Sequence, residues 1–476
     1  MTDLTALAAA FPAVTAADWR ALVEKTLKDA PFDSLTRTTA EGLPIAPLYE
    51  GADRSPAFPL RPFDAERPWD IRGRITHPDP VRANADLMTD LEGGAASALI
   101  RLDPTGAAGV AVGSAEGLAR VLDGVMLELA PVALDAGFLG PKAADWLAAA
   151  AKGSPAAKLF LHLDPLSAFA EAGESPGPIE SHLVSAATVA RRLAESYPDA
   201  GLFLASGRVV HEAGGGEAGE LAFAMAAAVA YAKALVRAGL PMQDAFARTV
   251  LGLSADADYF ATLAKLRAAR AVWSRITAAC GVTATPRIEA RSSHRMLAAH
   301  DPWTNMLRLT AAAVGASIGG GDSIVLGSFT DALGLPTAFA RRQSRNAQLV
   351  LMEEAHLGRV ADPGAGSGYV EALTDEIARA AWTAFQAIEA KGGLIAALAD
   401  GHIAAETARV REARVAGGPL KIVGVTAFPQ PDQAPVEVER ATPKAVEAPS
   451  PRLPGPDGRC PPLKPIRLAE PYEVAA

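Results

Sequence analysis

A glycine-rich loop is a candidate binding site for a ligand that carries phosphate groups. Residues 214–219 read Gly-Gly-Gly-Glu-Ala-Gly, follow a predicted strand and open a predicted helix. This G-x-G-x-x-G pattern can bind a dinucleotide pyrophosphate at a helix N-terminus. The pattern also requires a second strand ending in Asp or Glu about 20 residues later, but residues 221–237 continue as helix. We therefore interpret the loop as a strand-to-helix turn, and an NAD-dependent oxidoreductase is the weaker alternative.

Two further glycine loops and the scattered histidines do not predict a nucleotide or metal site. Residues 319–323 and 362–368 permit close backbone approach, but neither is followed by the Lys-Ser or Lys-Thr of a P-loop. His294 and His300 lie six positions apart, which does not place them on one helix face, and neither cysteine has a partner at metal-ligand spacing. We expect no metal site.

Arginines are dense in residues 267–270 and 341–346. Clustered guanidinium groups can bind the phosphates of an acidic ligand. Both clusters fall on predicted helices flanked by Asp and Glu, where arginines more often form structural ion pairs. We predict the structural role.

Predicted strands and helices alternate along the chain between about residues 95 and 425. Short β-branched or leucine-rich runs alternate with alanine-rich helical runs, which is typical of an α/β fold with a parallel sheet. Two buried runs end alike, in Asp103-Pro104 and Asp164-Pro165. This repetition favours a TIM (β/α)8 barrel over a doubly wound sheet, with functional groups at the carboxyl ends of the strands. The predicted strands are residues 98–102, 125–129, 159–163, 202–205, 287–290 and 323–326.

Helical patterns and a change of composition suggest three regions. We predict an N-terminal helical arm over residues 1–55, a barrel over 56–428 and a proline-rich tail over 429–476. Of the chain's 36 prolines, 12 fall in the last 48 residues, so the tail is expected to be extended in part. The predicted helices are residues 17–30, 217–237, 259–279, 302–317, 336–354 and 371–390.

The composition and net charge of the chain argue against some classes of binding partner. The chain has 476 residues, 50% of them hydrophobic and 21% charged, as in globular proteins. A net charge of −9 and the lack of a Lys/Arg run disfavour nucleic acid or an anionic membrane surface as partner. The apolar stretch 221–236 contains Lys233 and is predicted to be a buried helix rather than a membrane span. With no basic segment before the N-terminal apolar stretch and only 2 cysteines, we expect a cytoplasmic location.

Several separated motifs occur in a specific order over about residues 15 to 425. They are LVEKTLK at 22–28, GLPIAPLY at 42–49, RPWDIR at 67–72, LRAARAVW at 266–273, DPWTNMLR at 301–308 and DPGAGS at 362–367. Together they resemble the methylmalonyl-CoA mutase family of cobalamin-dependent carbon-skeleton isomerases. The resemblance agrees with the predicted fold, because the substrate domain of this family is a TIM barrel.

The resemblance implies a barrel that acyl-CoA threads and that cobalamin caps. In active members a C-terminal domain carries the histidine that ligates cobalt, and adenosylcobalamin supplies a radical for the rearrangement. Residues 468–473 (LAEPYE) resemble the first residues of that module in noncatalytic subunits. We therefore expect the cobalamin-binding domain to be absent from this chain.

Three positions depart from the pattern of catalytic members. Arg74 replaces the tyrosine that follows their Pro-Trp-x-Ile-Arg-Gln motif. Residues 206–214 (SGRVVHEAG) match SGYHMQEAG, on what we expect to be an active-site strand, and place Val209 at the histidine that hydrogen-bonds the thioester oxygen. Glu289 aligns with another family histidine. His211 lies two residues too late to substitute, about 6 to 7 Å along a strand. The resemblance therefore implies no catalytic residues in this chain.

Three residues match groups that contact ligands in the family. Arg67 and Arg72 match arginines of the CoA channel, and Glu212 matches a residue that faces the corrin. Because we expect no cofactor in this chain, we interpret all three as remnants with a structural role.

The resemblance implies the smaller, noncatalytic subunit of a heterodimer whose larger catalytic subunit binds substrate and adenosylcobalamin. The arm and the tail are candidates for wrapping that partner. An alternative is the barrel subunit of a split acyl-CoA mutase that borrows a separate cobalamin-binding subunit. Such an enzyme would have to keep the tyrosine and histidine that Arg74 and Val209 replace.

Overall fold

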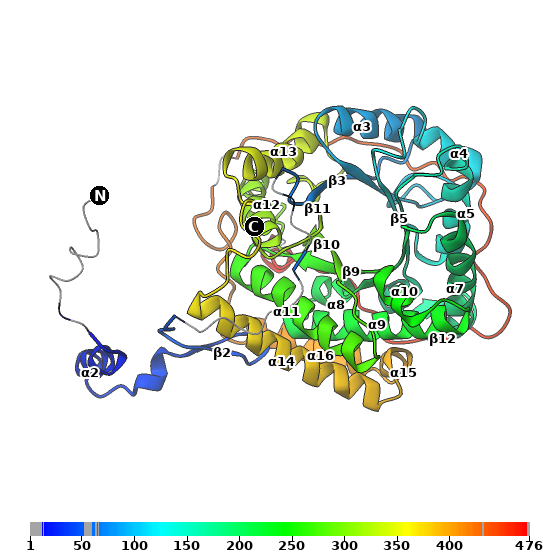
Figure 1. Ribbon diagram of the computed structural model, residues 1–476. Helices are drawn as coiled ribbons and strands as arrows, with labels where there is room; N and C mark the ends of the chain where they lie inside the picture. The colour runs from blue at the N-terminus through cyan, green and yellow to red at the C-terminus, as the bar shows by residue number, and fades with distance from the viewer. Residues whose placement is uncertain are drawn as a thin grey trace, which may run out of the picture.

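Eight parallel strands close into a barrel in the order β10-β11-β3-β4-β5-β6-β8-β9. The structure is a computed structural model that describes residues 14–51, 66–430 and 433–473, with Pro12, Leu60, Arg61 and Asp64. Helices surround the barrel (Figure 1). The prediction of a TIM barrel is therefore confirmed, and the alternative of a doubly wound sheet is wrong. The strands are β3 (Asp70–Ile75), β4 (Ser97–Arg101), β5 (Val132–Asp135), β6 (Leu159–Leu163), β8 (Gly201–Ser206), β9 (Thr249–Ala255), β10 (Arg287–Ser292) and β11 (Ser323–Val325).

Five of the six predicted strands are confirmed, and the strand predicted at 125–129 is wrong. That apolar run forms turns in which Met126 and Leu129 are 63% and 65% exposed, and β5 begins three residues later. The prediction also missed β3 and β9. In β3 the residues that point inward are charged, so the strand lacks the apolar signature of a buried one.

A ring of helices covers the strands, and the main apolar core lies between the two layers. The ring is α3 (Pro80–Glu92), α4 (Ala115–Val121), α5 (Gly140–Ala150), α7 (Ile179–Ser196), α9 (Glu217–Arg237), α11 (Tyr259–Ala279), α12 (Asn305–Ile318) and α13 (Ala338–Leu349). A second layer covers α9 and α11 and consists of α14 (Gly368–Ala390), α15 (Leu394–Ala399) and α16 (His402–Val415).

The predicted helix bounds are reproduced without change for α9 and α11. Among the described residues, α9 is the one helix with the length and hydropathy of a membrane span, but 72% of its most apolar window is buried inside the protein. The prediction of a buried helix is therefore confirmed, although the helix is longer than the stretch that suggested it.

The N-terminal arm has a docked part and a projecting part. Its helix α2 (Ala16–Leu27) is capped by Thr15 and has no buried residue. Figure 1 shows α2 standing away from the barrel. The short strands β1 (Arg37–Thr38) and β2 (Pro44–Ile45) then form an antiparallel pair, and Glu41 in the turn between them contacts the body of the protein at Ala218.

The described part of the tail makes a circuit of the barrel rim (Figure 1). Its backbone amides donate in turn to carbonyls in the segments that follow β11, β4, β6, β8 and β10. These hydrogen bonds run from Glu439 to Leu335, Val446 to Pro104, Leu453 to Pro176, Ile466 to Glu212 and Leu468 to Arg295. The tail is extended, as predicted, and this part of it wraps its own barrel.

Candidate functional site

A layer of charged side chains fills the barrel lumen. Glu289 and Arg291 lie two residues apart on β10, so both point inward. Glu289 accepts hydrogen bonds from Arg72 of β3 and from Arg291 Nε at 2.6 Å. Arg291 Nη1 also donates to Asp135 of β5 at 2.9 Å. Arg72 further contacts Ser97 Oγ at 2.9 Å, so the charges across the lumen are paired with one another.

The charge states in this layer are unsuited to proton transfer near neutral pH. Burial raises the pKa of Glu289, but Arg291 and Arg72 outweigh it and hold that pKa well below its usual range. Burial lowers the pKa of His162 to about 3, which leaves its imidazole neutral. A general base or acid works best with a pKa near the operating pH, and neither group has one.

A cavity of about 640 Å³ lies above this layer, at the carboxyl ends of the strands. Arg74, Val209 and Glu212 all line it, and Leu463 and Pro465 of the tail complete its wall. The structure therefore brings three of the six sequence-predicted site residues together at the place where a TIM barrel carries its functional groups.

The residues at the mouth are already engaged within the protein. Arg74 Nη2 lies 2.5 Å from Asp331 Oδ2. The Glu212 carboxylate accepts hydrogen bonds from the backbone N–H groups of His294 at 3.3 Å and Arg295 at 3.1 Å. Val209 lines the cavity, and its side chain has no polar hydrogen that could be donated in a hydrogen bond.

The two arginines predicted to be remnants of a CoA channel lie in different environments. Arg72 is fully buried in the lumen, where Glu289 and Asp70 neutralise it. The Arg67 side chain is 50% exposed before the start of β3 and reaches Asp70 at 3.1 Å. The structure therefore joins Arg72 to Glu289 and leaves Arg67 apart from both the lumen and the cavity.

Comparison with known proteins identifies the family. The family model of methylmalonyl-CoA mutase matches residues 64–452. The chain belongs to the methylmalonyl-CoA mutase family. It is 41% identical to the methylmalonyl-CoA mutase small subunit of Streptomyces virginiae, over 92% of this chain and 74% of that protein. It is 38% identical to a probable small subunit of Mycobacterium tuberculosis, over 85% and 68%, and 31% identical to a methylmalonyl-CoA mutase of Cereibacter sphaeroides, over 88% and 65%.

Within this mutase barrel, the expected active-site strand at residues 207–213 is wrong. Strand β8 ends at Ser206, and α8 (Arg208–Glu212) follows. Gly207 permits this turn, because a Cβ there would overlap the carbonyl oxygen of Glu220. The helical turn directs His211 away from the cavity, so His211 does not approach the position of the lost family histidine.

His211 belongs instead to a buried ion-pair cluster that sequence reasoning missed. Its Nδ1 lies 3.2 Å from Glu220, and its Nε2 lies 3.1 Å from Asp256. Burial and Arg295 oppose the charged form, but Glu220 and Asp256 outweigh them, so the pKa of His211 is raised. The spacing of Glu217 and Glu220 on one face of the predicted helix is the signal that could have located the cluster.

The same cluster offers a geometric metal site, but a lysine neutralises it. Among the described residues, ligand atoms of His211, Glu217 and Glu220 lie within 4.8 Å of one another. Lys265 Nζ lies 2.5 Å from both carboxylates. Its ammonium supplies the positive charge that a cation would bring, so the arrangement is that of a salt-bridge network.

The glycine-rich loop holds an internal carboxylate. Glu41 of the arm accepts hydrogen bonds from the backbone N–H groups of Ala218 and Gly219 at 3.0 to 3.1 Å. A Cβ on Gly216 would overlap the Glu41 carboxyl group. The loop thus leaves room for an anion at the N-terminus of α9, and the arm provides that anion.

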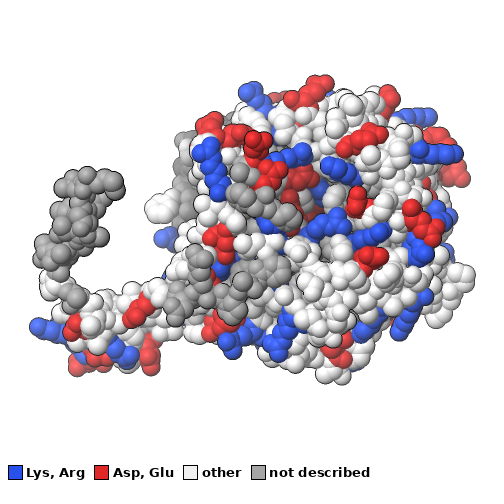
Figure 2. Space-filling model, viewed as in Figure 1, with Lys and Arg blue, Asp and Glu red and all other residues white. Residues whose placement is uncertain are grey.

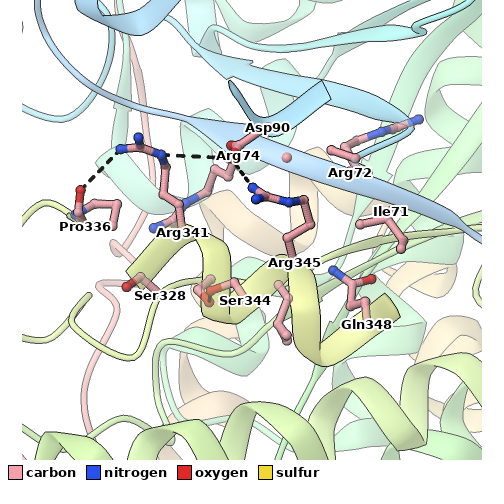
Figure 3. A pocket seen from close by; sticks show the side chains of 14 residues that line it. Ile71, Arg72, Arg74, Asp90, Ser328, Pro336, Arg341, Ser344, Arg345 and Gln348 are labelled. Atoms are coloured by element: carbon pink, nitrogen blue, oxygen red, sulfur yellow. Dashed lines mark hydrogen bonds and ion pairs between the residues drawn. The ribbon is translucent and has the colours of Figure 1, made fainter. Parts of the chain in front are cut away.

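The arginine clusters form structural ion pairs, as predicted. Arg267 lies 3.0 Å from Asp362, and Arg270 lies 3.0 Å from Asp322. Figure 3 shows Arg345 of α13 reaching Asp90 of α3, at 2.7 Å. On the face seen in Figure 2, the described Lys and Arg residues alternate with Asp and Glu and form no large basic patch.

Proposed function

We propose that this chain is the catalytically silent subunit of a heterodimeric adenosylcobalamin-dependent mutase. In this proposal a larger subunit interconverts methylmalonyl-CoA and succinyl-CoA, and the present barrel supports it. The observation that carries the proposal is the Arg72–Glu289–Arg291 layer in the lumen. Side chains of the protein itself occupy the barrel axis, which the family resemblance assigns to acyl-CoA.

The replaced positions support the same conclusion chemically. Glu289 stands where the resemblance places a histidine, and its ionised carboxylate cannot donate a hydrogen bond to a thioester oxygen. Val209 offers no polar hydrogen at the mouth, and the Arg74 guanidinium is paired with Asp331. At these three positions a family substrate would therefore meet the apolar side chain of Val209 and two charged groups, Arg74 and Glu289, that are already paired within the protein.

Adenosylcobalamin supplies radical chemistry when it is bound to a mutase. The rim of this barrel fits a corrin poorly. The Glu212 carboxylate is used by two backbone amides, and the tail residues Leu463 and Pro465 lie at the mouth of the cavity. We therefore place the cofactor on the larger subunit and derive no step through it on this chain.

The arm gives this proposal a physical contact with the partner. Helix α2 has no buried residue, and its Leu22 side chain is exposed on a helix that stands away from the barrel. The proposal keeps residues 1–55 as the partner-binding arm, 56–428 as the barrel and 429–476 as the tail. It also includes a cytoplasmic location, in keeping with the two unpaired cysteines.

The test is a mutase assay with adenosylcobalamin and methylmalonyl-CoA. The chain is purified alone and after co-expression with the larger mutase subunit of its own organism. We expect no turnover by the isolated chain and full turnover by a one-to-one complex. Turnover by the isolated chain would overturn the silent role. Turnover that needs only an added cobalamin-binding protein would favour the split mutase.

A further inference from the structure

The cavity at the carboxyl ends of the strands is large enough to hold a small molecule. Its volume is about 640 Å³, within the range of small-molecule sites. Arg291 belongs both to its lining and to the charged layer of the lumen, so that layer forms the floor. The tail adds to the wall, where the backbone N–H of Ile466 donates to the carbonyl of Glu212 at 2.8 Å. Because the layer closes the barrel axis, a ligand here must be short.

Two arginines at this cavity have N–H groups that the protein itself does not use. The Arg291 side chain is 8% exposed, and its Nη2 has no hydrogen-bond acceptor among the described residues. Arg208 Nη2 reaches Glu212 at 3.2 Å, but its buried Nε has no acceptor in the described part of the chain. Buried N–H groups are nearly always hydrogen-bonded, because leaving one unpaired is costly. A ligand with acceptor oxygens would complete these hydrogen bonds.

His162 adds a neutral donor at the same cavity. Its side chain is fully buried, and neither ring nitrogen has a hydrogen-bond partner within the described ranges. Its Nδ1 lies 4.0 Å from Glu289, which is too far for a hydrogen bond. Its φ of 47° is uncommon for a residue other than glycine, and strain of this kind is common at ligand sites. Because burial lowers the pKa of His162 to about 3, the ring is neutral and carries one N–H donor.

The arginines of the cavity repel one another. Burial lowers the pKa of the Arg208 guanidinium, and the nearby Arg291 lowers it further, against the effect of Glu212. Burial raises the pKa of Asp135, but Arg291, Arg101 and Arg208 outweigh it. Three guanidinium groups thus act on one carboxylate. A further anion in the cavity would reduce the repulsion between them.

The other carboxylates that line the cavity do not supply this anion. Asp103 accepts hydrogen bonds from two backbone N–H groups of its own loop, at 2.8 and 2.9 Å. Asp164 accepts one from the Tyr231 hydroxyl at 2.5 Å, and burial raises the pKa of Asp164 to about 7, so that about half of it is neutral at that pH. Glu171 is exposed, and Glu212 is used by two backbone amides. The missing acceptor oxygens must therefore come from a ligand.

We propose that this cavity binds a small organic acid whose carboxylate lies on Arg208, Arg291 and His162. Guanidinium groups match the geometry of a carboxylate and form strong, charge-assisted hydrogen bonds with it. The apolar part of the acid would contact Val209 and Leu463, which also line the cavity. The proposal goes beyond the proposed function, because it assigns a ligand to the silent barrel itself and involves neither the larger subunit nor the cofactor.

The residue types distinguish this site from the active site of catalytic relatives. Residues 206–214 match SGYHMQEAG, so Arg208 stands where that motif has a tyrosine. Gly207 ends β8 in a turn, and Arg208 is the first residue of α8, which places its side chain at the cavity. The guanidinium is therefore a feature of this chain rather than of the catalytic pattern.

The first test compares two probes that differ only in charge and acceptor strength. Butyrate and its neutral amide, butyramide, are titrated into the full-length chain by calorimetry at constant ionic strength. We expect butyrate to bind with a Kd of about 1 mM or tighter and butyramide at least about 10-fold more weakly. Equal binding of the two probes would show that no carboxylate is recognised, and the proposal would be wrong.

The second test uses a graded pair of variants with a matched control. Arg208→Gln removes the guanidinium, whereas Arg208→Lys keeps the charge without the planar fork. Arg67→Gln removes the same charge from a side chain that is 50% exposed and lies apart from the cavity. We expect Arg208→Gln to weaken butyrate binding at least about 10-fold, Arg208→Lys to be intermediate and Arg67→Gln to stay within about 2-fold. Circular dichroism establishes that each variant is folded.

Hydrogen exchange of the tail locates the bound probe. The backbone N–H groups of Leu463 and Ile466 donate to Ala170 and Glu212 at 2.8 Å, beside the cavity, so butyrate should slow their exchange. Unchanged exchange there, or equal weakening by Arg208→Gln and Arg67→Gln, would overturn the site. Inorganic phosphate that binds more tightly than butyrate and depends on Arg208 would mean an inorganic anion, and the organic acid would be wrong. None of these outcomes bears on turnover, so the proposed function is tested separately.

Discussion

The barrel lumen and the outer surface of α12 and α13 use opposite chemistry. In the lumen, Arg72, Glu289 and Arg291 are buried charges that neutralise one another. On α12 and α13, Leu307 and Phe339 are apolar groups exposed on the surface. Charge at the centre and apolar surface outside reverse the usual distribution. Below the cavity, charged side chains of the protein itself close the lumen, whereas at α12 and α13 apolar side chains remain exposed to solvent.

The largest effect should come from breaking the lumen, and the chain supplies a matched pair. Arg72 and Arg67 both pair with Asp70, the first fully buried and the second half-exposed. Arg72→Ala leaves Glu289 buried with one partner fewer, so we expect the free energy of unfolding to fall by about 3 to 5 kcal/mol. Arg67→Ala should cost less than about 1 kcal/mol. Urea unfolding followed by circular dichroism measures both, and equal losses would show that the lumen is not locked by charge.

How much of this could be read from the sequence depends on the range of the interactions. Helices α9 and α11 were predicted with correct bounds because alanine-rich composition and end signals are local. Strand β3 was missed because its inward residues are charged. The strand predicted at residues 125–129 was wrong because an apolar run next to a strand resembles one.

The site shows the same division. Resemblance to the family placed Val209 at the cavity and Glu289 in the barrel. The pairing of Glu289 with Arg72, 217 positions away, could not be seen in either local pattern. Likewise His211 was expected on a strand but lies on α8. Its contacts with Glu220 and Asp256 join three separate elements, so no local pattern predicts them. Tertiary neighbours, not residue types, determine what these groups do.

A second prediction tests whether interior charge is balanced beyond the lumen. Glu220 and Asp256 favour the charged form of His211, so its pKa in the folded protein is raised above 6.5. Its contribution to stability is therefore full below pH 6.5 and is lost as the pH rises through the folded pKa, at no more than about 1.4 kcal/mol per pH unit. His211→Gln should lower the free energy of unfolding by about 2 to 3 kcal/mol at pH 6.

The pH profile separates charge from packing at this position. Thermal unfolding of wild type and His211→Gln is compared from pH 6 to pH 9. The two stabilities should converge as the pH rises, because the wild-type imidazole loses its charge. Profiles with a constant difference in stability would mean that His211 acts by packing alone. The His211 cluster would then not be balanced by charge as the lumen is.

The smallest loss of unfolding free energy is expected in the arm, which has one part docked on the barrel and one part exposed to solvent. Its docked part is fastened by the Glu41 carboxylate on the backbone amides of Ala218 and Gly219, while α2 projects with no buried residue. Burial and the nearby Glu217 raise the pKa of Glu41, whereas the amides favour its charged form. Glu41→Gln keeps one acceptor oxygen and loses the charge, so we expect a cost of about 1 kcal/mol.

Gly216→Ala is the matched test from the other side of this contact. The φ of Gly216 is −105°, a conformation that alanine adopts, so the substitution acts only by pushing a Cβ into the Glu41 carboxyl group. Hydrogen exchange of residues 37–51 should rise in both variants, while exchange in the lumen strands stays unchanged. If exchange rises equally in β3 and β10, the arm is part of the barrel's own stability. Protection of the arm in both variants would mean that other contacts hold it, and Glu41 would then be only a helix cap for α9.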